Sequence, residues 1–135
     1  MKDLLSFKGW DKGMIDNLIR HASKIKKSPE KYFDILKNKT LLMIFEKPSL
    51  RTRLSFEAGM TQLGGHAIYL DVKDSPLGEK ESIEDTAKVA SRYCDIIMAR
   101  MFEQENIKKL AKNLLFCFQS LSSSTLLHLI PFKKI

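Results

Sequence analysis

Apolar and polar residues follow two different patterns along this chain. One pattern predicts helices and the other predicts strands. Between about Asp11 and Lys27 an apolar side chain recurs every three to four residues, which is typical of a helix with one buried face. Asp11 suits the N-cap of this helix, and Pro29 marks its end. The residues expected on the buried face are Met14, Ile15, Leu18, Ile19, Ala22 and Ile25.

Short apolar runs predict three strands, and a helical pattern follows each of them. The predicted strands span 40–45, 66–70 and 95–101. The predicted helices span about 50–63, 82–93 and 103–113. Gly64 and Gly65 suit the left-handed end of the first of these helices, and Ser82 to Asp85 is typical of a capping box at the start of the next. Within that second helix, Ile83, Ala87 and Ala90 should point inward.

This alternation of strands and helices predicts an α/β fold, a three-layer sandwich with a parallel sheet. The pattern breaks after residue 113. Residues 114–118 would suit a further strand, but the serine- and leucine-rich sequence up to residue 135 has no clear amphipathic period. We therefore expect one domain over residues 1–113, an atypical tail over residues 114–135, and a sheet that is incomplete at its C-terminal side.

Composition narrows the class of protein further. The chain has 135 residues, 44% of them apolar, which suffices for one domain with a core. The net charge is +7, and lysines are dense between Lys24 and Lys47. Such a stretch is typical of a solvent-exposed face. It could also bind nucleic acid, acidic membranes or anionic metabolites. Because no nucleic-acid-binding motif accompanies the lysines, we do not expect nucleic acid as a partner.

The sequence gives no signal for a membrane, a metal or a cofactor. No stretch reaches 18 apolar residues, and the N-terminus lacks the apolar core of a secretory signal. Cys94 and Cys117 form no CxxC motif, so we expect reduced thiols and a cytoplasmic protein.

The strongest chemical signal lies where the first strand meets its helix, in Phe45-Glu46-Lys47-Pro48-Ser49-Leu50-Arg51-Thr52-Arg53. Hydroxyl and guanidinium groups fall in the first helical turn, where unpaired N–H groups and the helix dipole favour an anion. The same residues would also suit an ordinary capped helix with Ser49 as the N-cap, so both interpretations stay open.

Three arginines can be told apart by their positions. Arg51 and Arg53 point about 200° away from each other on a helix, so they should not serve one phosphate. Glu57 lies four residues after Arg53 and suits an ion pair with it, which leaves Arg51 for a ligand. Arg100 ends the third strand, and the carboxyl ends of parallel strands share one edge of the sheet, so Arg100 should lie near the same junction.

The junction resembles the carbamoyl-phosphate loop of the aspartate/ornithine carbamoyltransferase family. The lead-in Phe45-Glu46-Lys47-Pro48-Ser49 and the later Gly64-Gly65-His66-Ala67 look closer to the ornithine branch than to the aspartate branch. The segments 81–87 and 91–100 extend the resemblance, which covers about residues 1–113.

The resemblance implies a carbamoyl-phosphate-binding domain. Ser49, Arg51, Thr52 and the backbone N–H of Leu50 would hold the phosphate, and Arg100 would contact the ligand from the neighbouring strand. Arg51 and Arg100 would be the catalytic residues for transfer of the carbamoyl group to the δ-amino group of ornithine, which gives citrulline and phosphate. The resemblance implies no metal, cofactor or covalent intermediate, and it implies a homotrimer.

The chain departs from the family pattern at three places. Leu50 stands where the family has a threonine, and Pro76 stands where it usually has a glutamine that reaches an adjacent subunit. The tail lacks the His-Pro-Cys-Gln segment of the family, and His128 lies near the expected position without that context. We expect no ornithine-binding domain within these residues, so ornithine would be a partner only if a second domain were supplied. A frameshifted reading of a longer gene is one hypothesis for the tail.

These departures leave more than one function open. The first expectation is a truncated ornithine carbamoyltransferase-like protein with little or no transferase activity on its own. The alternatives are a non-catalytic module that binds carbamoyl phosphate or another anion, or that assembles with an intact subunit, and a non-functional gene remnant. Nucleic-acid binding through the lysines would show as an affinity that falls steeply with salt.

Overall fold

The fold is an open parallel sheet with helices on both faces. The structure is a computed structural model that describes residues 4–74, 81–114 and 118–120. In this part of the chain the sheet has the strand order β2-β1-β3-β4, and all three pairings are parallel. The strands are β1 (Thr40–Phe45), β2 (His66–Asp71), β3 (Ile96–Arg100) and β4 (Phe118–Ser120).

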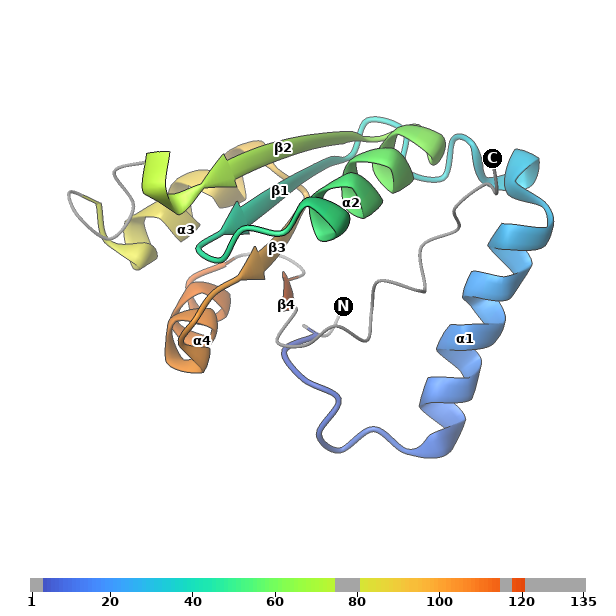
Figure 1. The fold of residues 1–135 in the computed structure, drawn as a ribbon, viewed down its shortest axis with the longest axis horizontal. Helices are drawn as coiled ribbons and strands as arrows, with labels where there is room; N and C mark the ends of the chain where they lie inside the picture. The colour runs from blue at the N-terminus through green and yellow to red at the C-terminus, as the bar shows by residue number, and fades with distance from the viewer. Residues whose placement is uncertain (1–3, 75–80, 115–117, 121–135) are drawn as a thin grey trace.

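Helix α2 covers one face of the sheet, while α3 and α4 cover the other, as Figure 1 shows. The helices are α1 (Lys12–Lys27), α2 (Leu50–Gln62), α3 (Ile83–Tyr93) and α4 (Gln104–Lys112). Two short 3₁₀ turns, η1 (Pro29–Tyr32) and η2 (Val72–Asp74), follow α1 and β2. The predicted α/β sandwich with a parallel sheet is therefore confirmed.

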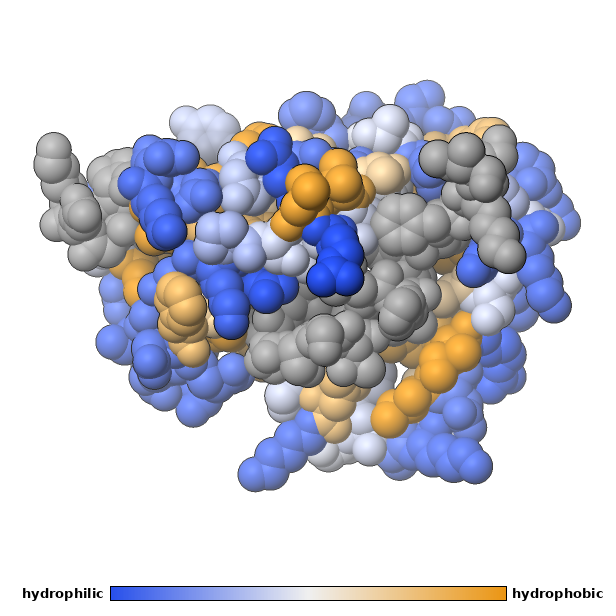
Figure 2. Space-filling model, viewed as in Figure 1, coloured by the Kyte–Doolittle hydropathy of each residue, from blue (hydrophilic) through white to orange (hydrophobic). Residues whose placement is uncertain are grey.

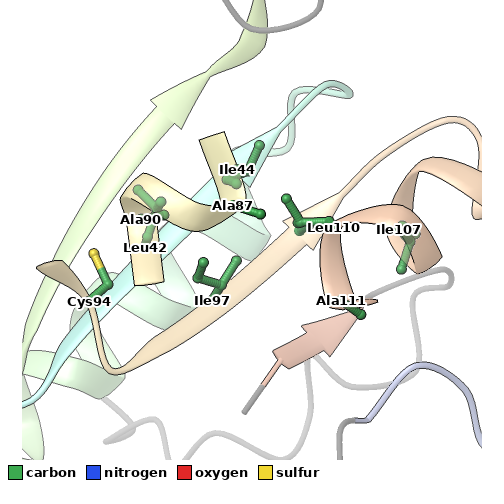
Figure 3. Close-up of a cluster of buried hydrophobic side chains, with 10 residues drawn as sticks. Leu42, Ile44, Ala87, Ala90, Cys94, Ile97, Ile107, Leu110 and Ala111 are labelled. Atoms are coloured by element: carbon green, nitrogen blue, oxygen red, sulfur yellow. The ribbon is translucent and has the colours of Figure 1, made fainter. Parts of the chain in front are cut away.

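Strand β1 is buried on both faces, which explains its unbroken apolar run. Its side chains alternate between the two sides of the sheet. Figure 3 shows Leu42 and Ile44 on the side of α3 and α4. The core on this side is made of Leu42, Ile44, Ala87, Ala90, Cys94, Ile97, Ala99, Ile107, Leu110 and Ala111. The core under α2 is made of Leu41, Met43, Phe45, Met60 and Met98.

Local signals in the sequence locate most element ends. Asp11 caps α1 by accepting the N–H of Met14 at 2.8 Å, and Ser82 caps α3 by accepting the N–H of Asp85 at 3.0 Å. Gly64 ends α2 with a φ of 84°, in the left-handed region expected of it. Ala87 and Ala90 face the core as predicted, and Ile83 is partly buried against the same core cluster.

The prediction of a buried face on α1 is wrong for the described residues. The helix forms where expected, but none of its residues is buried, and Met14, Ile15 and Ile19 are exposed. Its main contacts in this part of the chain are with η1. Figure 2 shows apolar atoms along one side of α1, which stands away from the sheet. Helical periodicity identifies an apolar face, but it does not say which element covers that face.

The candidate strand 114–118 lies mostly outside the described residues. The described strand β4 overlaps it at Phe118 and pairs with Ile97 to Ala99 of β3. Several sequence features lie outside the described residues, namely Pro76, Cys117, His128 and the tail from residue 121. Among the described helices, none combines the length and the hydropathy that crossing a bilayer requires.

Candidate functional site

The turn between β1 and α2 leaves the start of α2 without a side-chain cap. Ser49 occupies the N-cap position with an extended backbone, but its hydroxyl accepts no N–H from the first turn. This differs from α1 and α3, whose caps Asp11 and Ser82 accept such an N–H group. The capped-helix interpretation is therefore wrong as far as the Ser49 side chain is concerned. The positive end of the α2 dipole keeps its backbone donors for another partner.

The hydroxyl of Ser49 instead joins a short polar chain with Thr52 and Arg100. Ser49 Oγ lies 2.9 Å from Thr52 Oγ1, and Arg100 Nη1 donates to Thr52 Oγ1 at 3.3 Å. Thr52 is fully buried, whereas Ser49 and Arg100 are half-buried. A buried hydroxyl needs such partners, because an unpaired one costs free energy. The prediction that Arg100 lies near the junction is confirmed, since this contact joins β3 to the first turn of α2.

Arg51 and Arg53 have different surroundings, as their spacing suggested. Arg53 Nε donates to Glu57 Oε1 at 2.9 Å, so the predicted ion pair is confirmed. The Arg53 guanidinium also lies 4.0 Å from the ring centre of Tyr69 on β2, a cation–π contact that the sequence did not indicate. Arg51 is exposed, and its guanidinium has no hydrogen-bond or ion-pair partner within residues 4–74, 81–114 and 118–120.

Tyr69 and Asp71 line the end of β2 beside this arginine. The Tyr69 hydroxyl donates to Asp71 Oδ2 at 3.3 Å. Partial burial raises the pKa of the Tyr69 phenol, and the nearby Asp71 carboxylate raises it further. Tyr69 therefore stays protonated at neutral pH and serves as a neutral platform for Arg53.

Backbone contacts fix the ends of β1 and β3 relative to each other. The N–H groups of Glu46 and Lys47 donate to the carbonyl oxygen of Arg100 at 2.9 and 3.4 Å. The Glu46 side chain then accepts the N–H of Phe102 through Oε2 at 2.7 Å. Glu46 is part of the quoted motif, but the sequence gave it no role, because its partners lie far along the chain.

Leu50 adds an apolar surface to the start of α2. Its side chain is 70% exposed, and Leu54, one turn further on, is 51% exposed. Figure 2 shows apolar atoms over α2 beside strongly hydrophilic ones. Leucine in place of the family's threonine at position 50 therefore does not affect core packing. It changes only the surface at the junction.

The opposite edge of the sheet carries a different set of contacts. Asp95 Oδ1 pairs with Lys39 Nζ at 2.7 Å, and Asp95 Oδ2 accepts the N–H of Thr40 at 2.9 Å. These bonds, that of Lys39 first, lower the pKa of the Asp95 carboxyl below its ordinary value. A groove lined by Ile35, Tyr93 and their neighbours lies here, away from the strand ends that hold the arginines.

No three His, Cys, Asp or Glu side chains of the described residues come together in a way that would hold a metal ion. Cys94 is buried against α3, and burial raises the pKa of its thiol. At the carboxyl edge the carboxylates of Glu46 and Asp71 accept hydrogen bonds from Phe102 and Tyr69. At the first turn of α2 the structure brings together hydroxyl, guanidinium and backbone N–H groups. This set of donors suits an anion with several oxygen atoms.

The family profile described as "Aspartate/ornithine carbamoyltransferase, carbamoyl-P binding domain" matches residues 2–123. An ornithine carbamoyltransferase of Dechloromonas aromatica is 52% identical over 116 residues. That match covers 84% of this chain and 38% of the relative, so the chain spans little more than a third of such relatives.

Solved structures agree with the sequence comparison. Ornithine carbamoyltransferase from Pyrococcus furiosus superimposes with a TM-score of 0.81 at 40% identity, over 88% of this chain and 39% of that one. The catalytic subunit of M. jannaschii aspartate transcarbamoylase gives a TM-score of 0.80 at 32% identity, over 89% of this chain and 40% of that one. The resemblance inferred from the motifs is thereby confirmed.

Proposed function

Because this chain belongs to the aspartate/ornithine carbamoyltransferase family, we propose that it binds carbamoyl phosphate at the start of α2. The observation that carries the proposal is the contact of Arg100 Nη1 with Thr52 Oγ1 at 3.3 Å. It brings a guanidinium from β3 to a helix end whose N-cap side chain leaves the backbone donors free. The family profile that matches residues 2–123 is described as carbamoyl-phosphate binding, which supports the same ligand.

In this proposal the phosphate group lies against the first turn of α2. Ser49 and Arg51 provide side-chain donors, and Leu50 provides its backbone N–H. The buried Thr52 hydroxyl supports the site by contacting Ser49 Oγ and accepting Arg100 Nη1. Arg51 is the main cation, because it is exposed and has no protein partner among the described residues. Charge-assisted hydrogen bonds of this kind are roughly twice as strong as neutral ones.

Arg100 contacts the ligand from the neighbouring strand β3, beside the first turn of α2. When ornithine attacks the carbamoyl carbon through its δ-amino group, negative charge grows on the carbonyl and phosphate oxygens. Arg100 and the N–H groups of α2 are held in place by the fold, so they stabilise that charge with little reorganisation, and the exposed Arg51 adds a second cation. The products are citrulline and phosphate.

The transfer reaction is proposed only for a protein of the relatives' full length. The chain spans 38% of the relative from D. aromatica. Orienting the second reactant can supply about 7–11 kcal/mol of rate enhancement. We therefore expect residues 1–135 to bind carbamoyl phosphate without forming citrulline. We also propose that a protein of full length forms a trimer, as the family does.

Isothermal titration with carbamoyl phosphate tests this proposal. Wild type should bind saturably, and Arg51→Ala should lose at least 10-fold in affinity, since one charge-assisted bond is worth about 1.5–3 kcal/mol. Arg53→Ala is the matched control, because Arg53 is paired with Glu57 and should leave affinity unchanged. Equal affinities of wild type and Arg51→Ala would overturn the proposed site. A colorimetric citrulline assay with added ornithine then separates binding from turnover.

A further inference from the structure

Glu46 ties together the two segments that carry the candidate site. Its backbone N–H donates to the carbonyl oxygen of Arg100 at 2.9 Å. Its side-chain Oε2 accepts the N–H of Phe102 at 2.7 Å. The two bonds join Glu46 to the backbone of the residues before and after Met101. Glu46, which directly follows β1, therefore fixes the backbone that directly follows β3.

That stretch has few other restraints where it leaves the sheet. Arg100 is the last residue of β3, and its partner in β1 is Phe45. The register of β4 ends one residue earlier, at Ala99. Met101 packs against the core, but the Phe102 side chain is 64% exposed and gives the backbone no anchor by burial. The bond from Phe102 N–H to Glu46 therefore restrains the backbone on the far side of Met101, before α4 begins at Gln104.

The position of this restraint matters because of Arg100. The Arg100 guanidinium reaches across to Thr52 at 3.3 Å, and its direction depends on the backbone from which it starts. A carboxylate beside an anion site would itself weaken binding of a dianion. The Glu46 carboxylate keeps its charge, but one of its oxygen atoms accepts a backbone N–H, and this bond requires an acceptor and not a charge.

We propose that Glu46 is a positioning residue, which holds the Arg100 guanidinium toward the start of α2 by accepting the N–H of Phe102. This inference rests on the proposed function, and it goes beyond that function because Glu46 touches no ligand. A glutamine at this position keeps an oxygen acceptor and removes the charge. An alanine removes both, so the two variants separate positioning from electrostatics.

The first test observes Arg100 without any ligand. The ¹⁵N heteronuclear NOE of the Arg100 Nε–H group should be high in wild type and in Glu46→Gln, and low in Glu46→Ala. The Arg53 Nε–H group, which is bonded to Glu57, is an internal control and should stay ordered in all three proteins. An equally ordered Arg100 in Glu46→Ala would overturn the inference, whether or not carbamoyl phosphate binds.

The second test measures affinity for carbamoyl phosphate by titration calorimetry. Glu46→Ala should bind on the order of 10-fold more weakly, and Glu46→Gln should bind at least as tightly as wild type. In an Arg100→Ala background, Glu46→Ala should have no further effect, because the residue acts through Arg100. Equal weakening by both Glu46 variants, or additive losses with Arg100→Ala, would overturn the inference. If wild type fails to bind, the proposed function fails, while the NOE result still decides the role of Glu46.

Discussion

Thr52 Oγ1 lies 2.9 Å from Ser49 Oγ and accepts Arg100 Nη1 at 3.3 Å, so one fully buried hydroxyl joins β3 to the loop before α2. The contact connects residues that are 48 positions apart in the sequence. A helix residue thereby fixes the direction of a strand arginine. The geometry of the candidate site thus depends on a group in the protein interior as well as on its exposed cations.

Thr52→Val should weaken the site more than it weakens the fold. Valine keeps the shape of threonine, but it leaves Ser49 and Arg100 without their common partner. Both are half-buried and accessible to water, so unfolding in urea should show a loss of only about 1 kcal/mol. Calorimetry should show weaker binding of carbamoyl phosphate, by at least a few-fold. Thr52→Ser keeps the hydroxyl and should retain most of the affinity; if it binds as poorly as the valine variant, the hydroxyl is not responsible.

Leu50→Thr should strengthen binding, because it restores the hydroxyl that the family pattern carries at this position. A hydrogen bond to a charged ligand is worth about 1.5–3 kcal/mol, or on the order of 10- to 100-fold in affinity. Leu50 is 70% exposed, so its replacement removes no core contact and costs only about 0.5 kcal/mol in helix propensity. Leu50→Val, which is branched like threonine but has no hydroxyl, is the matched control in the same titration. A gain in both variants would point to side-chain shape instead.

Sequence reasoning found the fold where the controlling signal was local. An unbroken apolar run of strand length predicted β1, because a central parallel strand is buried on both faces. Asp11, Gly64 and Ser82 marked helix ends through bonds that span only a few residues. The ion pair of Arg53 with Glu57 was predictable for the same reason, since both lie on one helix, one turn apart.

Contacts between distant segments were beyond the reach of the sequence. The bond between Glu46 and Phe102 joins residues 56 positions apart, and it exists because β1 lies directly beside β3. The stacking of Arg53 on Tyr69 likewise depends on β2 pairing with β1 beneath α2. Local periodicity predicts neither the order of the strands nor the position of the helices. For the same reason it did not predict that the apolar face of α1 is exposed.

Asp95→Asn should lower the free energy of unfolding at neutral pH. The variant should also lose less of this free energy than wild type does when the pH falls. The lowered pKa of the Asp95 carboxyl means that the folded state favours the charged form. Its contribution is therefore present above about pH 4, the ordinary range of aspartate, and is lost as the pH falls through the lowered folded value. The side chain is 35% exposed, so solvent screening limits the effect to about 1 kcal/mol or less.

Urea unfolding between pH 2.5 and pH 7 measures this contribution. Wild type and Asp95→Asn should differ most at pH 7 and converge at the acid end. Asp16→Asn removes an exposed carboxylate of α1 and is the control for the general change in net charge. Curves that stay parallel for wild type and Asp95→Asn over the whole range would contradict the assignment of Asp95 as a charged clamp between β1 and β3.

Gly64→Ala should destabilise the protein more than Gly9→Ala, although the two glycines have nearly the same φ of 84° and 85°. A left-handed backbone costs an alanine about 1–2 kcal/mol at either position. At Gly64 the new Cβ would also overlap the carbonyl oxygen of Phe33, a backbone atom that cannot move away alone, whereas Gly9 has open space around it. We expect a loss of about 3 kcal/mol or more for Gly64→Ala, because a clash adds to the backbone strain. Urea unfolding of both variants measures the difference, and equal losses would show that the turn after α2 does not press against residue 33.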